Sequence, residues 1–226
     1  MAISEKTFAK RKKQIIKAAE KLFIRNGFQE VSMDNIARQA DISKPTLYNY
    51  FQSKMDIYYV CLVTSYIHRW QKTKPKNYEE KTGFDLVKEY ADNLIAYGYQ
   101  YPEHLLFTSN VSEQNFDVLI FHNNVSQSVI DEYGPKFLAA QKAYSSLFEK
   151  GFEDKTIRKV DGIGVQIYFL YSLRGYIIER VSALIKLKKR GRLSTEQKEG
   201  IEKLIVLSRE ELRFHLENLL RIIRPE

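Results

Sequence analysis

The sequence predicts an all-α protein of two parts, an N-terminal domain of three helices at residues 1–53 and a larger helical domain at residues 54–226. Three observations lead to this prediction. Apolar residues recur at helical spacing in one segment after another along the chain. Residues 32–51 contain two short helical patterns separated by a tight turn. Residues 195–224 carry an apolar stripe at near-constant helical spacing, and 226 residues suffice for a sizeable core.

The first helix is expected at about residues 7–26, and a basic arm at residues 4–13 overlaps its start. Its apolar stripe consists of Ile15, Ala18, Ala19, Leu22 and Phe23. Gly27 follows the stripe as the expected C-cap, because glycine adopts the left-handed backbone that ends many helices.

The segment from Ser32 to Phe51 is the most informative stretch. Ser32 is the expected N-cap of its first helix, whose hydroxyl accepts a bond from an unpaired backbone N–H. The apolar face of that helix consists of Met33, Ile36, Ala37 and Ala40. Residues 41–43 make the turn, and either Ser43 or Lys44 caps the second helix. Pro45 then falls in the first turn, where its missing N–H has no cost.

The second short helix has an inward face made by Leu47 and Phe51, which are four residues apart. Its outward side chains are Lys44, Thr46, Tyr48, Asn49 and Tyr50. A cation, hydroxyls and an amide on a short helix suit phosphate oxygens and base edges. This is the layout of a DNA-binding helix-turn-helix, whose second helix enters the major groove. The alternative at this point is a surface helix that binds nothing.

Neighbouring residues extend the pattern, and the run from Arg11 to Ile57 resembles the N-terminal domain of the tetracycline-repressor (TetR) family. The matching residues are Ile15, Ala18-Ala19, Leu22-Phe23, Gly27-Phe28, Ser32-Met33, Ile36-Ala37, Ala40, Ile42-Ser43-Lys44, Thr46-Leu47-Tyr48, Tyr50-Phe51, Ser53-Lys54 and Asp56. The sequence departs from the family at Asp41 and Pro45, where glycine is common. Asp tolerates left-handed backbone better than most residues, so we expect the turn to survive. Pro45 is expected to change which bases of the DNA the second helix recognises.

The resemblance implies a set of DNA-facing residues in this sequence: Lys10, Arg11, Ser32, Lys44, Pro45, Thr46, Tyr48, Asn49, Tyr50 and Lys54. Lys10 and Arg11 belong to the basic arm, which some relatives use for extra contacts. Thr46 and Asn49 are expected at base edges. Tyr48 and Lys54 are expected at phosphates, and Lys54 lies in the first turn of the next helix, which Ser53 caps.

Charge is distributed unevenly along the chain. The formal net charge is +8, and the first 57 residues contain 11 Lys and Arg against 6 Asp and Glu. The positive excess is therefore concentrated at the helix-turn-helix end, which favours a polyanionic partner there. A solvated basic surface without a partner is the alternative.

The cysteine content and the hydropathy of the chain indicate the environment in which the protein is expected. Cys61 is the single cysteine, so an intramolecular disulfide is impossible, and we expect a buried thiol and a cytoplasmic location. Residues 1–14 are too polar for a signal peptide. No uncharged apolar run reaches the eighteen or so residues of a membrane span, and no membrane partner is expected.

The remaining helices follow from apolar spacing and from proline and glycine positions. They are expected at about residues 54–74, 79–101, a short helix around 105–107, 131–151, 161–189 and 195–224. Residues 108–130 are expected as a loop or a bent helix. The 161–189 helix is apolar on more than one face, with Ile167 and Ile177 on one and Val165 and Leu173 on another. Such a helix needs cover on all sides. A homodimer through the last two helices, forming a four-helix bundle that recognises a palindromic operator, is therefore expected, as the resemblance also implies. A monomer with two core helices is the alternative.

The larger domain is rich in aromatic residues that are candidates for an apolar ligand pocket between helices. The candidates are Tyr66, Trp70, Tyr90, Tyr97, Phe107, Phe121 and Phe148. Each of them taken singly is more often a simple core residue. Arg174 lies on an apolar stripe and needs a partner, either a carboxylate of the protein or an anionic ligand with an apolar body.

Catalytic and metal-binding patterns are absent from the sequence. The four histidines are far apart without i, i+4 pairing, and Asp161-Gly162-Ile163-Gly164 has neither a preceding strand nor a third glycine. We therefore expect no enzyme, no cofactor and no metal. The favoured function is a ligand-responsive transcriptional regulator, a repressor by resemblance, that a small apolar or amphipathic effector releases from double-stranded DNA. An architectural dimer that recruits protein partners without sensing a small molecule is the competing hypothesis.

Overall fold

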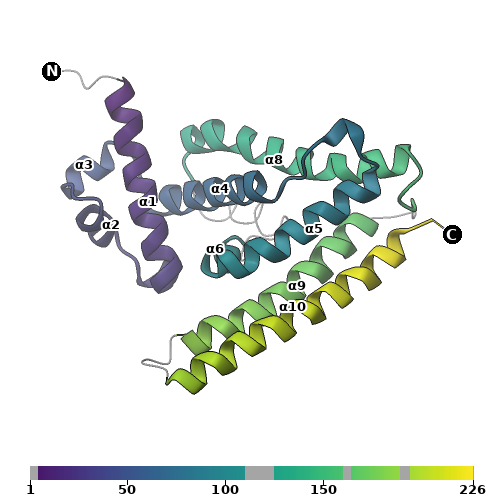
Figure 1. Cartoon of the computed structure of the whole chain (residues 1–226). Helices are drawn as coiled ribbons and strands as arrows, with labels where there is room; N and C mark the ends of the chain where they lie inside the picture. The colour runs from purple at the N-terminus through teal and green to yellow at the C-terminus, as the bar shows by residue number, and fades with distance from the viewer. Residues whose placement is uncertain (1–4, 110–124, 160–163, 189–193, 226) are drawn as a thin grey trace. The chain divides into compact units, whose positions relative to one another are not determined.

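The computed structural model describes residues 5–109, 125–159, 164–188 and 194–225 of the chain. Its elements are helices, and no strand occurs in this part, which confirms the predicted all-α class (Figure 1). The helices are α1 (Glu5–Glu30), α2 (Met33–Gln39), α3 (Lys44–Tyr48), α4 (Lys54–Thr73), the 3₁₀ helix η1 (Tyr78–Glu80), α5 (Gly83–Gln100), α6 (Pro102–Ser109), α8 (Gln127–Glu153), α9 (Val165–Lys188) and α10 (Thr195–Ile223).

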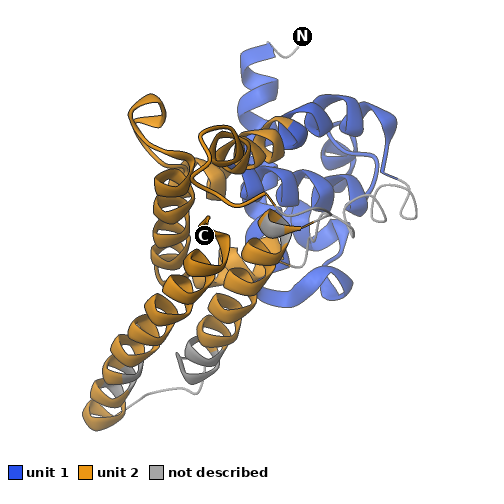
Figure 2. Cartoon of the chain, turned by 90° about the vertical axis from the view of Figure 1, so that its right-hand side faces the viewer, with its two compact units in different colours: residues 1–67, 110–138 blue, residues 68–109, 139–226 orange. Residues whose placement is uncertain are grey.

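The chain forms two compact units, which Figure 2 distinguishes by colour. The first unit comprises residues 1–67 and 110–138, and the second comprises residues 68–109 and 139–226. Two boundaries between the units fall inside α4 and α8, and the third follows the last residue of α6. The division at residue 53 proposed from the sequence concerns the DNA-binding segment alone and stays a prediction.

The first unit is built around α1, which packs on α2, and α2 in turn packs on α3. Its buried core contains Ile15, Ala19, Phe23, Ile36, Leu47, Phe51, Ile57, Val60 and Cys61. From Glu5 onward the predicted basic arm is part of α1, which begins two residues before the expected start at residue 7. Gly27 interrupts α1 with a φ of 79°. Such a positive φ favours glycine and is the backbone conformation that the predicted cap at Gly27 requires.

The start of α4 is fixed by a reciprocal pair of hydrogen bonds. The Asp56 backbone N–H donates to Ser53 Oγ at 3.0 Å, and the Ser53 N–H donates to Asp56 Oδ2 at 3.2 Å, which confirms Ser53 as the cap. Asp56 is fully buried, and its second oxygen accepts the Ser126 N–H at 2.7 Å. The buried carboxylate therefore accepts two described hydrogen bonds, one on each oxygen, as a buried charge requires.

The second unit has one continuous hydrophobic core to which α5, α8, α9 and α10 contribute. On α5 a stripe at helical spacing is buried at Phe84, Val87, Ala91 and Leu94. On α10 the buried residues are Leu212, Leu216, Leu219, Leu220 and Ile223, as the helical spacing predicted. In this unit α9 and α10 lie side by side, and α5 packs against both (Figure 1).

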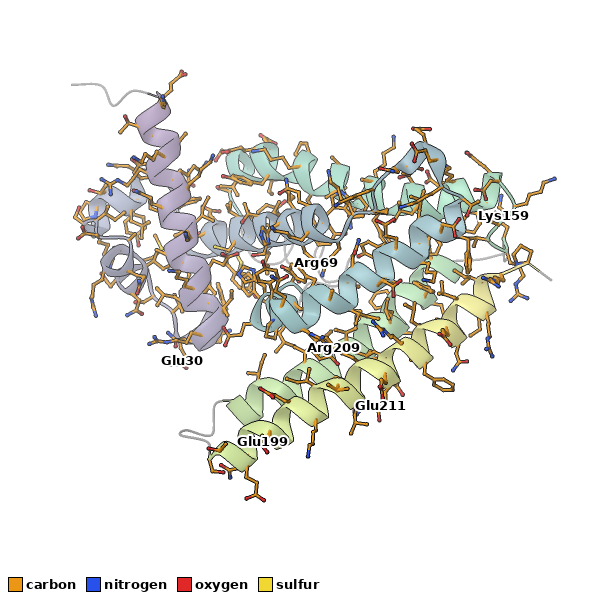
Figure 3. The ribbon with its side chains drawn as sticks, viewed as in Figure 1. Glu30, Arg69, Lys159, Glu199, Arg209 and Glu211 are labelled. Atoms are coloured by element: carbon orange, nitrogen blue, oxygen red, sulfur yellow. The ribbon has the colours of Figure 1, made fainter. Side chains whose placement is uncertain are left out.

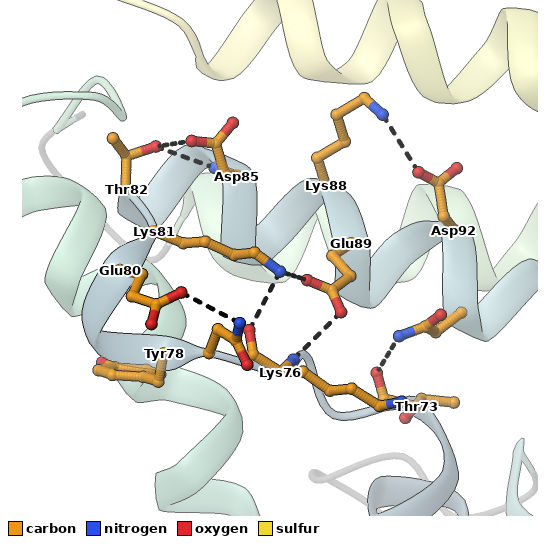
Figure 4. A network of polar contacts seen from close by, with 12 residues as sticks. Thr73, Lys76, Tyr78, Glu80, Lys81, Thr82, Asp85, Lys88, Glu89 and Asp92 are labelled. Carbon is orange, nitrogen blue, oxygen red and sulfur yellow. Dashed lines mark hydrogen bonds and ion pairs between the residues drawn. The ribbon is translucent and has the colours of Figure 1, made fainter.

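The predicted starts of α5 and α8 are among the helix boundaries that differ from the structure. The helix expected from residue 79 begins at Gly83, because Thr82 caps it by accepting the Asp85 N–H, while Glu79 and Glu80 lie in η1. The segment before the cap is bonded to Glu89, which accepts from the Lys76 backbone at 3.1 Å and from Lys81 Nζ (Figure 4). These bonds compete with helical continuation.

The second difference concerns α8, which was expected from residue 131 and begins at Gln127. Residues 127–130, the end of the segment expected as a loop or a bent helix, are therefore helical, and Pro135 lies inside α8. At the other end of the chain, Ser194 caps α10 through a capping box with Gln197 that the sequence prediction did not include. Residues 161 and 189, the expected ends of the preceding helix, lie outside the described residues.

None of the described helices has the length and apolar character that crossing a membrane requires. Cys61 is a free, fully buried thiol beside the Ile16 carbonyl, as predicted. Burial raises the pKa of this thiol well above its usual range, so the thiol is protonated and unreactive in the folded protein.

Candidate DNA-binding site

The helix-turn-helix is held together by its caps and by one turn residue. Ser32 caps α2 by accepting the Asn35 N–H at 3.1 Å, and Asn35 Oδ1 accepts the Ser32 N–H at 2.9 Å in return. Ser43 caps α3 by accepting the Thr46 N–H at 3.2 Å, which settles the choice between Ser43 and Lys44. Asp41 has a φ of 54°, so aspartate occupies the left-handed turn position as expected.

The two faces of α3 differ in burial as the sequence predicted. Leu47 is fully buried and Phe51 is 2% exposed, so they anchor the helix in the core of the first unit. On the opposite side Tyr48 is 48% exposed, and Asn49, the C-cap residue, is exposed as well. The Asn49 side-chain amide forms no hydrogen bond with the described residues, so its donor and acceptor are available to a base edge.

Two other polar residues of α3 take part in local contacts. Lys44 Nζ donates to Asp34 Oδ2 at 2.8 Å, and this hydrogen bond together with the charge of Asp34 raises the pKa of Lys44. The Thr46 hydroxyl lies 2.7 Å from the Ser43 hydroxyl. Both groups are therefore oriented, and the exposed Lys44–Asp34 pair can open at little cost to let the ammonium reach a phosphate.

Two of the predicted DNA contacts are engaged inside the first unit. Lys54 Nζ donates to the Phe28 carbonyl at 2.8 Å and lies 4.1 Å from the centroid of the Phe28 ring. The half-buried Tyr50 ring stacks on Phe8 of α1 with a centroid distance of 4.4 Å. Neither contact could be read from the sequence, because each depends on how α1 packs against the segment after α3.

The basic residues of α1 divide into two groups. Lys10, Arg11 and Lys13 are exposed, and no described residue bonds to them. Lys12 is instead bound to Glu132 of α8 at 2.5 Å, and its ammonium lies 5.2 Å from the centroid of the Tyr133 ring. Burial would raise the pKa of Glu132, but the bond from Lys12 and its charge lower that pKa overall. Lys12 thus joins α1 to α8, whereas its neighbours remain available to a polyanion.

The predicted ligand-binding aromatic residues lie mostly in hydrophobic cores. In the second unit Tyr90, Tyr97, Phe107 and Phe148 are at most 5% exposed. Trp70 is half-buried, and its ring lies 5.9 Å from that of Tyr90. These contacts agree with the core alternative for each residue, and their role in ligand binding stays a prediction.

The other ligand candidates are placed apart from this group. Tyr66 belongs to the first unit, where it packs edge-on against Phe137 at 4.9 Å. Phe121 lies outside the described residues. Arg174 is half-buried on α9 and donates to the Ser109 carbonyl at 3.1 Å, with its guanidinium 5.3 Å from the Tyr171 ring centroid. A backbone carbonyl therefore supplies one of the partners that its burial requires.

Sequence inspection missed the residues that orient the site. Asp34 and Asn35 were not singled out, although a capping box places a polar N3 residue three positions after Ser32. Among the described residues, no three His, Cys, Asp or Glu side chains come together in an arrangement that could hold a metal ion.

Residues 15–59 match the family model described as bacterial regulatory proteins, tetR family. The chain is also similar to the HTH-type transcriptional activator FasR of Mycolicibacterium smegmatis, with 40% identity over 52 residues. This match covers 23% of the present chain and about a quarter, 24%, of the relative. Each of these two matches covers less than a quarter of the chain.

Solved structures extend the likeness to the whole fold. A TetR-family protein from Vibrio parahaemolyticus superposes with a TM-score of 0.60 at 14% identity, covering 95% of this chain and 98% of its own. The flavonoid-responsive regulator FrrA superposes with a TM-score of 0.54 at 23% identity, covering 96% and 99%. At these identities the likeness concerns the arrangement of helices.

Proposed function

Because this chain belongs to the TetR family of bacterial regulatory proteins, we propose that it is a transcriptional regulator that binds double-stranded DNA. The observation that carries the proposal is the exposed polar face of α3, where Tyr48 and Asn49 project from a helix that Leu47 anchors in the core. A rigidly held short helix with hydroxyl, amide and ammonium groups on its free side suits the major groove.

The proposed DNA contacts are of two kinds, contacts to base edges and contacts to phosphates. Asn49 and Thr46 meet base edges, and Asn49 has an uncommitted amide that can pair with adenine in two places. Tyr48, Lys44 and the α1 residues Lys10 and Arg11 meet phosphates, which position the protein without specifying sequence. Lys54 joins them by exchanging the Phe28 carbonyl for a phosphate oxygen.

A homodimer through α9 and α10 is part of the proposal. Phe214 is 69% exposed on α10, Leu207 one heptad earlier is 55% exposed, and Tyr168 on α9 is 55% exposed. Large apolar side chains on exposed helix faces mark a surface that another protein covers. A two-fold dimer presents two α3 helices to the two halves of a palindromic operator.

The proposal also includes a response to a small-molecule effector and the direction of regulation, that is, repression or activation. A small apolar or amphipathic effector that binds the DNA-incompetent state better shifts the dimer away from its operator. We favour repression with release by the effector. The relative FasR is named as an activator and FrrA as flavonoid-responsive, so a promoter fusion measured with and without the protein decides the sign. The chain acts in the cytoplasm and catalyses no reaction.

One observation favours a second candidate function. The aromatic residues expected around a pocket are packed in the core, with Phe148 fully buried and Tyr97 3% exposed. This packing suits an architectural dimer that recruits protein partners without sensing a small molecule. Release of DNA by any small molecule at a saturable site contradicts that candidate.

Selection of binding sites from a random double-stranded DNA library tests the proposed function. The purified protein is expected to enrich a palindromic sequence. The variant Asn49→Ala should relax the preference at one position in each half-site, whereas Gln39→Ala, an exposed change at the end of α2, should leave the enriched sequence unchanged. Failure to enrich any sequence would refute sequence-specific regulation.

A further inference from the structure

A groove of about 770 Å³ runs between α5 and α10 in the second unit. Its volume falls within the range of sites that hold small molecules. None of the aromatic residues predicted for ligand binding lines it. The residues that line it are Lys88, Asp92, Ile95, Ala96, Tyr99, Gln100, Arg209, Arg213, Leu216, Glu217 and Leu220.

The groove has an apolar floor and a charged rim. Ile95, Leu216 and Leu220 are 2–7% exposed and form the floor, with their other sides in the core of the second unit. Lys88 and Asp92 extend from α5 toward α10, where Lys88 Nζ donates to Asp92 Oδ2 at 3.2 Å (Figure 4). This pair neutralises itself, so the other rim charges determine which ligand the groove attracts.

The α10 side of the rim supplies two guanidinium groups, those of Arg209 and Arg213, and one carboxylate, that of Glu217, so its formal charge is +1. Arg209 lies between α10 and α5 (Figure 3), with its guanidinium carbon 4.8 Å from the centroid of the Tyr99 ring. The Tyr99 hydroxyl in turn bonds to the Ser208 hydroxyl. Neither Arg209 nor Arg213 forms a hydrogen bond or an ion pair with the described residues. Arg209 is therefore held at the rim by its ring contact, with its N–H donors available.

We propose that the α5–α10 groove binds a small amphipathic anion, whose apolar body lies on Ile95, Leu216 and Leu220 and whose carboxylate or phosphate head meets Arg209 and Arg213. Charge complementarity and the apolar floor select this class of ligand together. The inference rests on the proposed function, because it assigns the ligand class and the site of the proposed effector.

The groove remains accessible in the proposed dimer. Arg213 and Phe214 are consecutive on α10 and therefore point about 100° apart, since 3.6 residues complete one helical turn. Arg213 faces the groove, whereas Phe214 and Leu207 lie on the exposed apolar face of the same helix. Dimer formation and ligand binding thus use different sides of α10.

Isothermal titration calorimetry of the full-length protein with dodecanoate, below its micellar concentration and without DNA, tests the site. Dodecanoate should bind saturably, whereas the cationic dodecyltrimethylammonium should bind at least tenfold more weakly. The double variant Arg209→Gln/Arg213→Gln should weaken dodecanoate binding about tenfold. Ala96→Trp, which fills the groove from an exposed position, should abolish it.

Arg221→Gln is the matched control, because Arg221 is an exposed arginine of α10 that does not line the groove. It should bind dodecanoate within twofold of the wild type, and thermal unfolding checks that every variant is folded. Absence of binding to the wild type, or equal binding by all variants, overturns the groove assignment. Saturable, variant-sensitive binding that leaves DNA affinity unchanged confirms the site and refutes the effector response in the proposed function.

Discussion

Replacement of Phe214 by alanine is predicted to weaken the proposed dimer. A Phe side chain buries about 200 Å² when it is fully covered, and Phe214 is 69% exposed, which leaves about 140 Å² for a partner. If the partner covers half of that area, each copy contributes about 1.8 kcal/mol at about 25 cal/mol per Å². Both copies change in a homodimer, so the variant loses about 3.5 kcal/mol and its dimer Kd rises about 300-fold.

Sedimentation velocity over a concentration series measures this shift, and Leu138→Ala is the control. Leu138 is 63% exposed, nearly as much as Phe214, but it lies on α8 rather than on α9 or α10. The wild type and Leu138→Ala should sediment as dimers at concentrations where Phe214→Ala is monomeric. A monomeric wild type, or a Phe214→Ala protein with an unchanged dimer Kd, would refute the assignment of the interface.

Three further predictions concern the first unit. Ser32→Ala removes the N-cap of α2 and should lower the free energy of unfolding by about 1 kcal/mol in urea titrations, and a loss below 0.3 kcal/mol would contradict the capping role. Cys61 should resist a thiol reagent in the native protein and react once urea unfolds it, because it is fully buried with a raised pKa; rapid native labelling would contradict this. The pKa of Glu132 in the folded protein is lowered from its ordinary 4.5. The bond between Glu132 and Lys12 therefore stabilises the protein fully above pH 4.5, and this stabilisation is lost as the pH falls through the folded-state pKa of Glu132. Glu132→Gln should therefore cost about 0.5–1 kcal/mol at pH 7 and flatten the acid dependence of stability, whereas the exposed Glu30→Gln should do neither; equal effects of both variants would refute the pairing.

The helix-turn-helix could be predicted in detail because its determinants are local in sequence. A serine precedes both α2 and α3 and caps them. Gly27 interrupts α1, and Asp41 tolerates the left-handed turn between α2 and α3. Leu47 and Phe51, four residues apart, point inward at the spacing of a helix. Each of these determinants acts within a few residues, so one sequence suffices to identify it.

The remaining features depend on contacts between distant parts of the chain. Lys12 and Glu132 are 120 residues apart, and nothing in either neighbourhood predicts their bond. Lys54 was expected to face DNA, but the carbonyl that binds it belongs to Phe28. Aromatic residues at helical spacing fit a core and a pocket equally well, and only packing shows that Tyr97 and Phe148 are buried in the core. The α5–α10 groove could not be predicted from the sequence for the same reason, because its two walls are more than a hundred residues apart in the chain.

The central claim is that the exposed face of α3 recognises base edges. Its most direct test is the Kd of the wild type and of Asn49→Ala for the selected operator and for each single-base-pair change, by fluorescence anisotropy at fixed salt. Asn49→Ala should weaken operator binding by about 1–3 kcal/mol and lose discrimination at one position in each half-site, while every other position keeps its wild-type penalty. Full discrimination at all positions by Asn49→Ala, or a uniform loss across all sequences, would contradict the account.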